Sequence, residues 1–200
     1  MAIEHVDALI VGAGISGLGA AVHLKKLCPG KTFAIMERRK NFGGTWDLFR
    51  YPGIRSDSDM YTLGFRFKPW TSRKAIADAP AIMGYLKETI AENDLGKDIH
   101  YNSHVKKANW SSEDARWIVE GTRDGKPMTI SCNMLFMCAG YYNYDQGYTP
   151  DFPGMSGFKG QIVHPQHWPE KLDYQGKKVI VIGSGATAVT LVPAMAEAGA

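Results

Sequence analysis

A glycine cluster near the start of the chain, residues 12–17 (GAGISG), constrains the fold more than any other feature. An apolar run, Asp7–Val11, leads into it, and Leu18–Leu27 follows with good helix formers before Pro29-Gly30 ends the helix. In such a turn the first glycine permits the tight bend, the second lets backbone approach a pyrophosphate, and the third lets the helix pack on the strand. The pattern therefore predicts strand, turn and helix, with unpaired N–H groups at the helix start.

An acidic residue follows at the spacing that a dinucleotide-binding turn requires. A second apolar run, Phe33–Met36, ends in Glu37, whose carboxylate could accept both hydroxyl hydrogens of an adenosine ribose and would repel a 2′-phosphate. The glycines alone fit a purely structural turn equally well, but strand, helix and acid together favour nucleotide binding. We predict an FAD or NAD site, with pyrophosphate contacts at Gly12, Gly14, Ser16 and Gly17.

The same pattern recurs late in the chain. Lys178–Ile182 is a predicted strand, residues 183–188 (GSGATA) form the turn, and Val189–Ala200 is helical. Ala188 replaces the third glycine, a substitution that is common where NADP binds. Two turns favour two dinucleotides, and the alternative is a packed strand-helix junction in a repeated domain.

The intervening sequence completes an α/β fold. Residues 38–75 lack periodicity and are predicted as an irregular loop region, and Pro80–Asn93 is predicted as an amphipathic helix. Short runs between Ile99 and Cys132 predict a β-meander. The apolar run Met134–Gly140 predicts a further strand in a buried parallel sheet.

Charge and composition exclude several classes. The net charge of +3 is small and the basic residues are scattered, so we expect no nucleic-acid partner. No run approaches the roughly 20 apolar residues of a spanning helix, and acidic Glu4 and Asp7 stand where a signal peptide would be basic. We expect a cytoplasmic protein without stable membrane insertion, and peripheral membrane contact stays open. The cysteines show no metal or disulfide spacing, and His164 and His167 lack a third ligand, so no metal site is predicted.

Two further motifs carry a resemblance to a known family. The fingerprint FxGxxxHxxxWP lies between the two glycine turns, and it is matched by Phe158, Gly160, His164, Trp168 and Pro169. A second stretch contains Gly43-Gly44-Thr45-Trp46, then Arg50–Gly53 and Arg55–Asp57. The chain resembles the class B flavoprotein monooxygenases and, through Trp168, their type I Baeyer–Villiger branch. Residues 43–70 look most like the ethionamide-activating subgroup. Members of the family are more than twice as long as this chain.

The resemblance implies a cofactor pair and a reaction. NADPH reduces FAD, which reacts with molecular oxygen to a C4a-peroxyflavin, and this species converts a small ketone into an ester or lactone. The resemblance also implies an FAD-binding Rossmann-like domain over residues 1–145, a connector with the fingerprint over 146–175, and the start of a second, NADP-binding Rossmann-like domain over 176–200.

Site residues follow from the same resemblance. FAD contacts are expected at Gly44, Thr45, Trp46, Asp47, Leu48, Asp57 and, through its backbone near the adenine, Val105. NADP contacts are expected at Arg55, Ser56, Asp57, Gly183, Ser184, Gly185, Ala186, Thr187, Ala188 and Val189. Asp57 is the catalytic candidate, because in the family this acid orients an arginine from a later segment, and His164 is expected to couple domain rotation to NADP position.

Plainer interpretations remain beside these. Asp57 could cap a helix or turn that begins near Ser58, and His164 could be an ordinary surface histidine. The same scaffold also fits an oxygenase that acts on sulfides, thioamides or amines. Because the sequence ends within the second predicted helix, a truncated flavin-binding fragment without turnover is a third hypothesis.

Overall fold

The computed structural model describes residues 4–200, and these residues form two compact units. The first unit contains the residues up to Asp47 together with Met83–Tyr141, and the second contains Leu48–Ile82 and Tyr142–Ala200. Two of the boundaries fall within helix α2 (Thr45–Leu48) and helix α4 (Ala79–Glu92), and the third follows Tyr141. Each unit is therefore built from two separate stretches of sequence.

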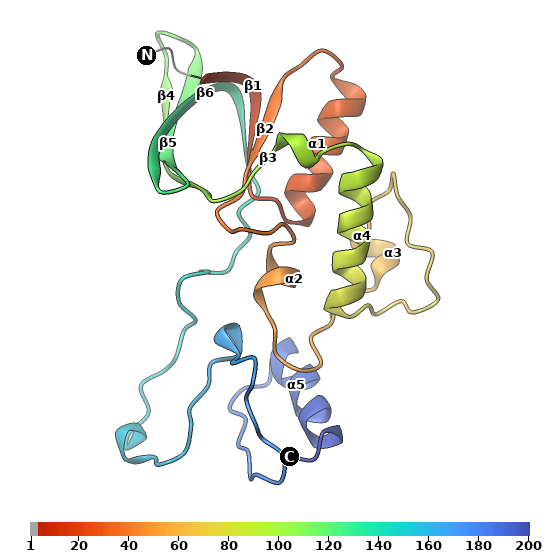
Figure 1. Cartoon of the computed structure of the whole chain (residues 1–200), viewed down its shortest axis with the longest axis vertical. Helices are drawn as coiled ribbons and strands as arrows, with labels where there is room; N and C mark the ends of the chain where they lie inside the picture. Colours follow the sequence, from red (N-terminus) through yellow and green to blue (C-terminus); the bar gives the residue numbers. More distant parts are fainter. Residues whose placement is uncertain (1–3) are drawn as a thin grey trace. The chain divides into compact units, whose positions relative to one another are not determined.

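A six-stranded sheet in the order β3-β2-β1-β6-β5-β4 is the centre of the first unit (Figure 1). Strands β1 (Glu4–Val11), β2 (Phe33–Met36) and β3 (Ile99–His100) run parallel, and β6 (Lys126–Met137) lies parallel to β1 on its other side. Strands β4 (Ser103–Ser111) and β5 (Arg116–Arg123) continue from β6 in antiparallel pairing. This arrangement confirms the predicted α/β class, with a parallel sheet and a β-meander.

Strand β6 corrects one detail of the sequence-based prediction. The last of the short runs predicted before Cys132, Met128–Ile130, and the run Met134–Gly140 were expected as separate strands, but they form one strand that pairs with β5 and then with β1. The two polar residues between the runs, Ser131 and Asn133, both have side chains within hydrogen-bonding distance of the His5 ring, at 2.9 and 3.1 Å. The strand ends at Met137, and Gly140 has a φ of 75°.

Helix α1 (Ile15–Leu27) contacts β1 and β2 through a fully buried face that contains Leu18, Ala21 and Val22. The apolar cluster of this unit joins the parallel strands to the meander, and it includes Leu9, Ala34, Met36, Val119, Ile130 and Cys132. These contacts bury apolar surface, and each Å² buried stabilises the fold by about 25 cal/mol. They fix the carboxyl ends of β1 and β2, where the glycine turn and Glu37 lie.

Helix α4 lies within one residue of its predicted limits. Asp78 accepts a hydrogen bond from the Ala81 N–H at 2.9 Å, and Pro80 occupies the first turn, where its missing N–H costs nothing. The predicted buried face is present in Ile82, Tyr85 and Leu86. The helix start is therefore set by a cap that precedes the proline.

The second unit packs around helix α5 (Ala186–Glu197). Its apolar cluster contains Phe49, Tyr51, Leu191 and Met195, with Trp168 packed against it. The unit also holds the short helices α3 (Met60–Leu63), η2 (Met155–Gly157) and η3 (Pro165–His167), whereas η1 (Gly96–Asp98) belongs to the first unit. Among the described residues, no helix is both long and apolar enough to cross a bilayer.

The predicted strand Lys178–Ile182 is wrong for this structure. Within residues 4–200 the segment pairs with no strand, and Ile180 and Ile182 are 83% and 74% exposed. A strand requires a neighbouring strand for its hydrogen bonds, whereas a helix closes its own. Helix α5 accordingly forms while the segment before it stays unpaired.

Candidate functional site

The first glycine turn has the geometry of a dinucleotide cradle. Gly12 has a φ of 107°, and a Cβ atom there would collide with the carbonyl oxygen of Cys138. A Cβ on Gly17 would collide with the carbonyl oxygen of Gly12, so α1 approaches β1 as closely as glycine allows. In the part of the chain that the structure describes, no side chain caps α1 at Gly14. The N–H groups of the first turn are thus free to bind an anion.

Glu37 lies beside this turn at the end of β2. Its side chain is only 5% exposed, and its two carboxylate oxygens accept hydrogen bonds from the backbone N–H groups of Ala13 and Arg39, each at 2.8 Å. Its own carbonyl oxygen accepts a 2.8 Å bond from Ser103, which begins β4. Each carboxylate oxygen keeps a second lone pair, so the orientation that ribose binding requires is fixed by the backbone.

The glycine loop and α2 complete the cluster in the first unit. Gly43 donates its N–H to Ala13 at 2.9 Å, and a Cβ on Gly14 would lie 3.7 Å from the Cα of Gly44. Asp47 in α2 is 5% exposed and lies 2.8 Å from the guanidinium of Arg39. The structure therefore brings together the first turn, Glu37, Gly44 and Asp47, which are far apart in sequence order.

Val105 lies on β4, two residues after Ser103, and it packs partly buried against the core of the sheet. The pairing of β4 with β5 shifts register between Val105 and Lys107. Such a bulge disrupts the ladder locally. The backbone at Val105 is thus irregular at the position where the resemblance implies an adenine contact.

Arg55, Ser56 and Asp57 lie in the second unit on a segment pinned by backbone hydrogen bonds. Arg55 forms an antiparallel bridge with Asp78, and Ser56 donates its N–H to Ala77 at 2.9 Å. Arg55 and Asp57 are exposed, but Ser56 is 2% exposed and its hydroxyl donates to the Ser58 carbonyl at 2.6 Å. The Ser56 hydroxyl is therefore engaged within its own turn.

The alternative role of Asp57 as a helix cap is wrong. Asp59 caps α3, because its carboxylate accepts hydrogen bonds from the Thr62 N–H at 2.9 Å and from the Thr62 hydroxyl at 3.0 Å. Asp59 has the extended backbone that a capping residue needs, with φ −69° and ψ 147°. The exposed carboxylate of Asp57 is left without this structural role.

The second glycine turn leads into α5. Gly183 has a φ of 140°, Gly185 occupies the cap position, and residues 182–186 are exposed to solvent. The helix rests on Phe49 and Tyr51 through Leu191 and Met195. A Cβ on Gly53 would collide with the Thr190 carbonyl oxygen and lie 2.7 Å from the Cβ of Ala194. The backbone at Gly53 therefore packs directly against α5.

The fingerprint residues have different structural surroundings. Nδ1 of His164 accepts a 3.2 Å bond from the Gln166 N–H, and its ring fills the space beside Gly147. Trp168 packs edge-to-face on Tyr174, with ring centroids 6.1 Å apart. Phe158 is exposed, and its ring folds over Gly160. His164 is the N-cap residue of the short helix η3. Within residues 4–200 no cluster of metal-ligating side chains is present.

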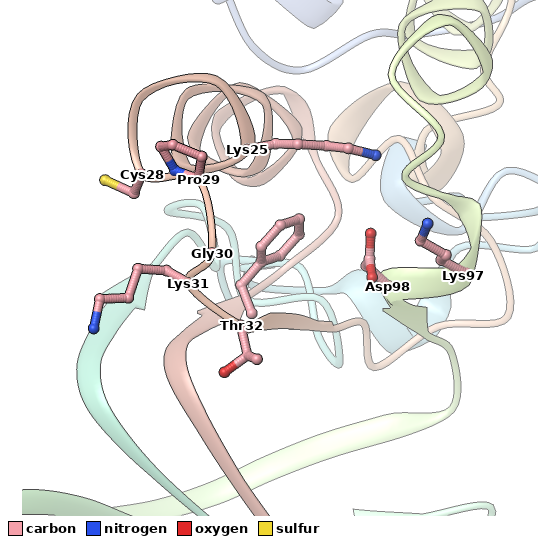
Figure 2. Close-up of a pocket in the computed structure, with 9 residues that line it drawn as sticks. Lys25, Cys28, Pro29, Gly30, Lys31, Thr32, Lys97 and Asp98 are labelled. Atoms are coloured by element: carbon pink, nitrogen blue, oxygen red, sulfur yellow. The ribbon is translucent and has the colours of Figure 1, made fainter.

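A pocket of about 290 Å³ lies away from these residues, at the opposite end of β2 from Glu37. Figure 2 shows Lys25 from α1 among the residues that line this pocket, together with Lys97 and Asp98 from η1. Lys25 donates hydrogen bonds to the backbone carbonyls of Asn93 and Asp94. Burial raises the pKa of the Asp98 carboxyl above its usual value. The pocket does not coincide with the predicted dinucleotide site.

Arg39 is the site residue that sequence reasoning missed. No spacing rule links it to Asp47 or Gly44, and its position two residues after Glu37 was the sole available signal. The structure shows that its guanidinium contacts both of these residues.

Comparisons with known proteins match nearly the whole chain. A model of the flavin-binding monooxygenase-like family matches residues 75–199, and a model of the NAD(P)-binding Rossmann-like domain matches residues 10–78. The FAD-containing monooxygenase EthA of Mycolicibacterium smegmatis is 60% identical over 98% of this chain and 40% of its own length. The probable FAD-binding monooxygenase AlmA of an Acinetobacter species is 59% identical over the same shares of the two chains.

Solved structures show the same relationship. An oxidized steroid monooxygenase bound to NADP superposes with a TM-score of 0.83 at 32% identity, over 98% of this chain and 37% of the other. Cyclohexanone monooxygenase from Rhodococcus sp. Phi1 gives a TM-score of 0.80 at 28% identity over the same shares. The chain thus spans about 40% of the length of the curated relatives. Because the family model covers more than half of the sequence, the chain belongs to the flavin-binding monooxygenase-like family.

Proposed function

We propose that the full-length protein is an FAD- and NADPH-dependent monooxygenase, and that this chain carries its FAD site and part of its NADPH site. The observation that carries the proposal is the cradle in the first unit. Gly12 and Gly17 leave room for a dinucleotide beside the N–H donors of the helix start, and Glu37 supplies an oriented carboxylate. The relatives are described as FAD-containing or FAD-binding monooxygenases. When bound, FAD would supply the redox chemistry with oxygen.

The residues of the first unit fit the two ends of FAD. The first turn of α1 would hold the pyrophosphate on its N–H groups and on exposed Ser16, and Glu37 would accept the ribose hydroxyl hydrogens. The backbone at Val105 would meet the adenine. Gly44 to Leu48 would contact the flavin, since Gly44, at the start of this segment, lies next to the first turn at Gly14.

The second turn and the segment around Asp57 would bind NADPH. Residues 183–189 present an exposed turn and an uncapped helix start, which is the arrangement that binds a pyrophosphate. Arg55 is an exposed cation in the second unit, and Asp57 is an exposed carboxylate two residues later. Asp57 would orient a cation that stabilises developing negative charge during oxygen transfer.

Among the reactions of this family, we propose oxygen insertion beside a ketone carbonyl, with molecular oxygen and a small ketone as substrates. The support is Trp168 in the fingerprint, together with structural similarity to a cyclohexanone monooxygenase and a steroid monooxygenase. Oxygenation of sulfur or nitrogen compounds is the second candidate. It is favoured by the resemblance of residues 43–70 to the ethionamide-activating subgroup and by 60% identity to EthA.

Paired substrates test this proposal on the purified full-length protein. We expect a yellow protein with bound FAD that oxidises NADPH in the presence of cyclohexanone and releases a lactone. Sulfoxide formation from thioanisole without lactone formation would reject the ketone proposal and favour the second candidate. Absence of bound flavin would reject the cofactor proposal itself.

The 200-residue chain by itself serves as a matched comparison. We expect it to bind FAD without product formation from either substrate, since the predicted arginine partner of Asp57 lies outside it. Turnover by this chain would contradict that assignment. An Asp57→Asn variant of the full-length protein should retain FAD and lose most product formation.

A further inference from the structure

Arg39 makes contacts in two directions within the first unit. Its backbone N–H donates to Glu37 Oε1 at 2.8 Å. Its guanidinium donates to the carbonyl oxygens of Gly44 and Asp47, each at 3.3 Å, and lies 2.8 Å from the Asp47 carboxylate. We refer to these four residues, Glu37, Arg39, Gly44 and Asp47, as the Arg39 bridge.

The Asp47 end of the bridge is buried, and Arg39 is half-buried. The side chain of Asp47 is 5% exposed and that of Arg39 is 25% exposed. A buried carboxylate is stable only when it is paired and hydrogen-bonded, and charge-assisted bonds of this kind are roughly twice as strong as neutral ones. Two of the guanidinium contacts reach main-chain oxygens, so Arg39 fixes the path of the loop in addition to balancing the charge of Asp47.

The loop needs such a fixed point because its glycines are permissive. Gly43 and Gly44 have φ values of 109° and 56°, and such residues lose more conformational freedom on folding than any others. The Gly43 N–H bond to Ala13 holds the start of the loop. Arg39 holds the part that follows, where α2 begins.

We propose that Arg39 is a positioning residue that holds the Gly44–Asp47 segment at a fixed distance from Glu37, so that the flavin and ribose contacts of FAD are set together. The inference rests on the proposed FAD site. It gives the buried carboxylate of Asp47 the role of an anchor for Arg39, while the FAD contact at this position comes from the backbone. The side chains of Arg39 and Asp47 then act as one unit.

A double-mutant cycle on the full-length protein tests this inference. The variants are Arg39→Ala, Asp47→Asn, their combination and Arg39→Lys, with Lys40→Ala as the matched control because it removes an exposed neighbouring cation. Apoprotein is titrated with FAD, and the visible circular dichroism of the bound flavin is recorded at saturation. We expect Arg39→Ala to weaken FAD binding about tenfold, the size of a coupling between residues in one hydrogen-bond network.

The combined variant should bind FAD no more weakly than Arg39→Ala, because Asp47→Asn removes the charge that Arg39→Ala leaves unpaired. Arg39→Lys should restore part of the affinity, since lysine keeps the charge but lacks the fork that reaches both carbonyls. The visible dichroism should change in Arg39→Ala and stay unchanged in Lys40→Ala. These responses would separate positioning of the flavin from a general loss of folding.

Additive effects of Arg39→Ala and Asp47→Asn would overturn the proposal, because Asp47 would then act on FAD independently. Unchanged affinity and dichroism in Arg39→Ala would overturn it as well. If Arg39→Ala fails to fold, the isosteric Asp47→Asn decides the matter by the same two measurements. Failure of the wild-type protein to bind FAD rejects the proposed function instead, so the two failures are distinct.

Discussion

Gly53→Ala is expected to loosen α5 by a mechanism that the structure resolves into two parts. Gly53 has a φ of 76°, and for a residue with a Cβ this left-handed conformation costs about 1–2 kcal/mol. The new Cβ would also collide with the Thr190 carbonyl oxygen and lie 2.7 Å from the Cβ of Ala194. Overpacking of this kind costs about 1–3 kcal/mol, so the total is about 2–5 kcal/mol.

A second glycine separates the two costs. Gly154 lies in the same unit with a φ of 83°, and a Cβ there would meet no atom within 4 Å. Gly154→Ala should therefore carry the conformational cost alone. The difference between the two variants isolates the collision with α5, at about 1–3 kcal/mol.

Hydrogen exchange of the α5 amides measures this difference. Local opening that becomes easier by 1–3 kcal/mol speeds exchange by about 5- to 150-fold. We expect this acceleration of α5 amide exchange in Gly53→Ala. In Gly154→Ala we expect only the change that the conformational cost produces. Because α5 follows the proposed NADPH turn, KM for NADPH should rise in Gly53→Ala while FAD content stays unchanged. Equal exchange of α5 in the two variants would refute the packing argument.

The remaining predictions concern substitutions of single carboxylates. Glu37→Gln should lower the free energy of unfolding by about 1–3 kcal/mol in urea titrations, because one backbone N–H loses its acceptor, and it should also weaken flavin retention. Asp7 has its pKa lowered to about 2, chiefly by the Thr32 N–H and then by Lys31. The stability it adds is present above its unfolded pKa of about 4 and is lost as the pH falls toward 2. Wild type and Asp7→Asn should accordingly differ in urea midpoint at pH 6 and converge at pH 2. Asp59→Ala should cost about 1 kcal/mol through loss of the α3 cap, whereas Asp57→Ala should reduce product formation without a comparable loss in urea stability.

The sequence predicted best those elements whose hydrogen bonds are local. Helix α1 was predictable from the glycine turn before it and the Pro29-Gly30 stop after it, and α4 from periodicity and the proline in its first turn, because these signals act within a few residues. The β-meander was also predicted, but the break inside β6 was not real. Ser131, which lies between the two runs, has His5 as its partner, and His5 is too distant in sequence to be inferred from local pattern.

The unpaired segment before α5 shows where prediction from local sequence pattern fails. Lys178–Ile182 has the composition of a buried strand, yet β-structure depends on a neighbour at hydrogen-bonding distance and not on composition alone. Most of its residues therefore remain exposed and without regular structure, with the glycine turn and α5 formed after them. Propensity predicted the helix, which needs no partner, and failed for the strand, which needs one.

The residues of the candidate site likewise differ in whether local sequence pattern can predict them. The residues predicted to touch FAD, Gly12, Gly17 and Glu37, lie in a motif whose spacing follows from the shape of the cofactor. Arg39, the residue that we propose holds the Gly44–Asp47 segment relative to Glu37, reaches Asp47 across two glycines with positive φ, and no spacing rule specifies that path. Binding residues are constrained by the ligand, whereas positioning residues are constrained by the particular loop. A second flavoprotein with the same glycines and acid could therefore use a different anchor, and Arg39→Ala tests whether this chain depends on its own.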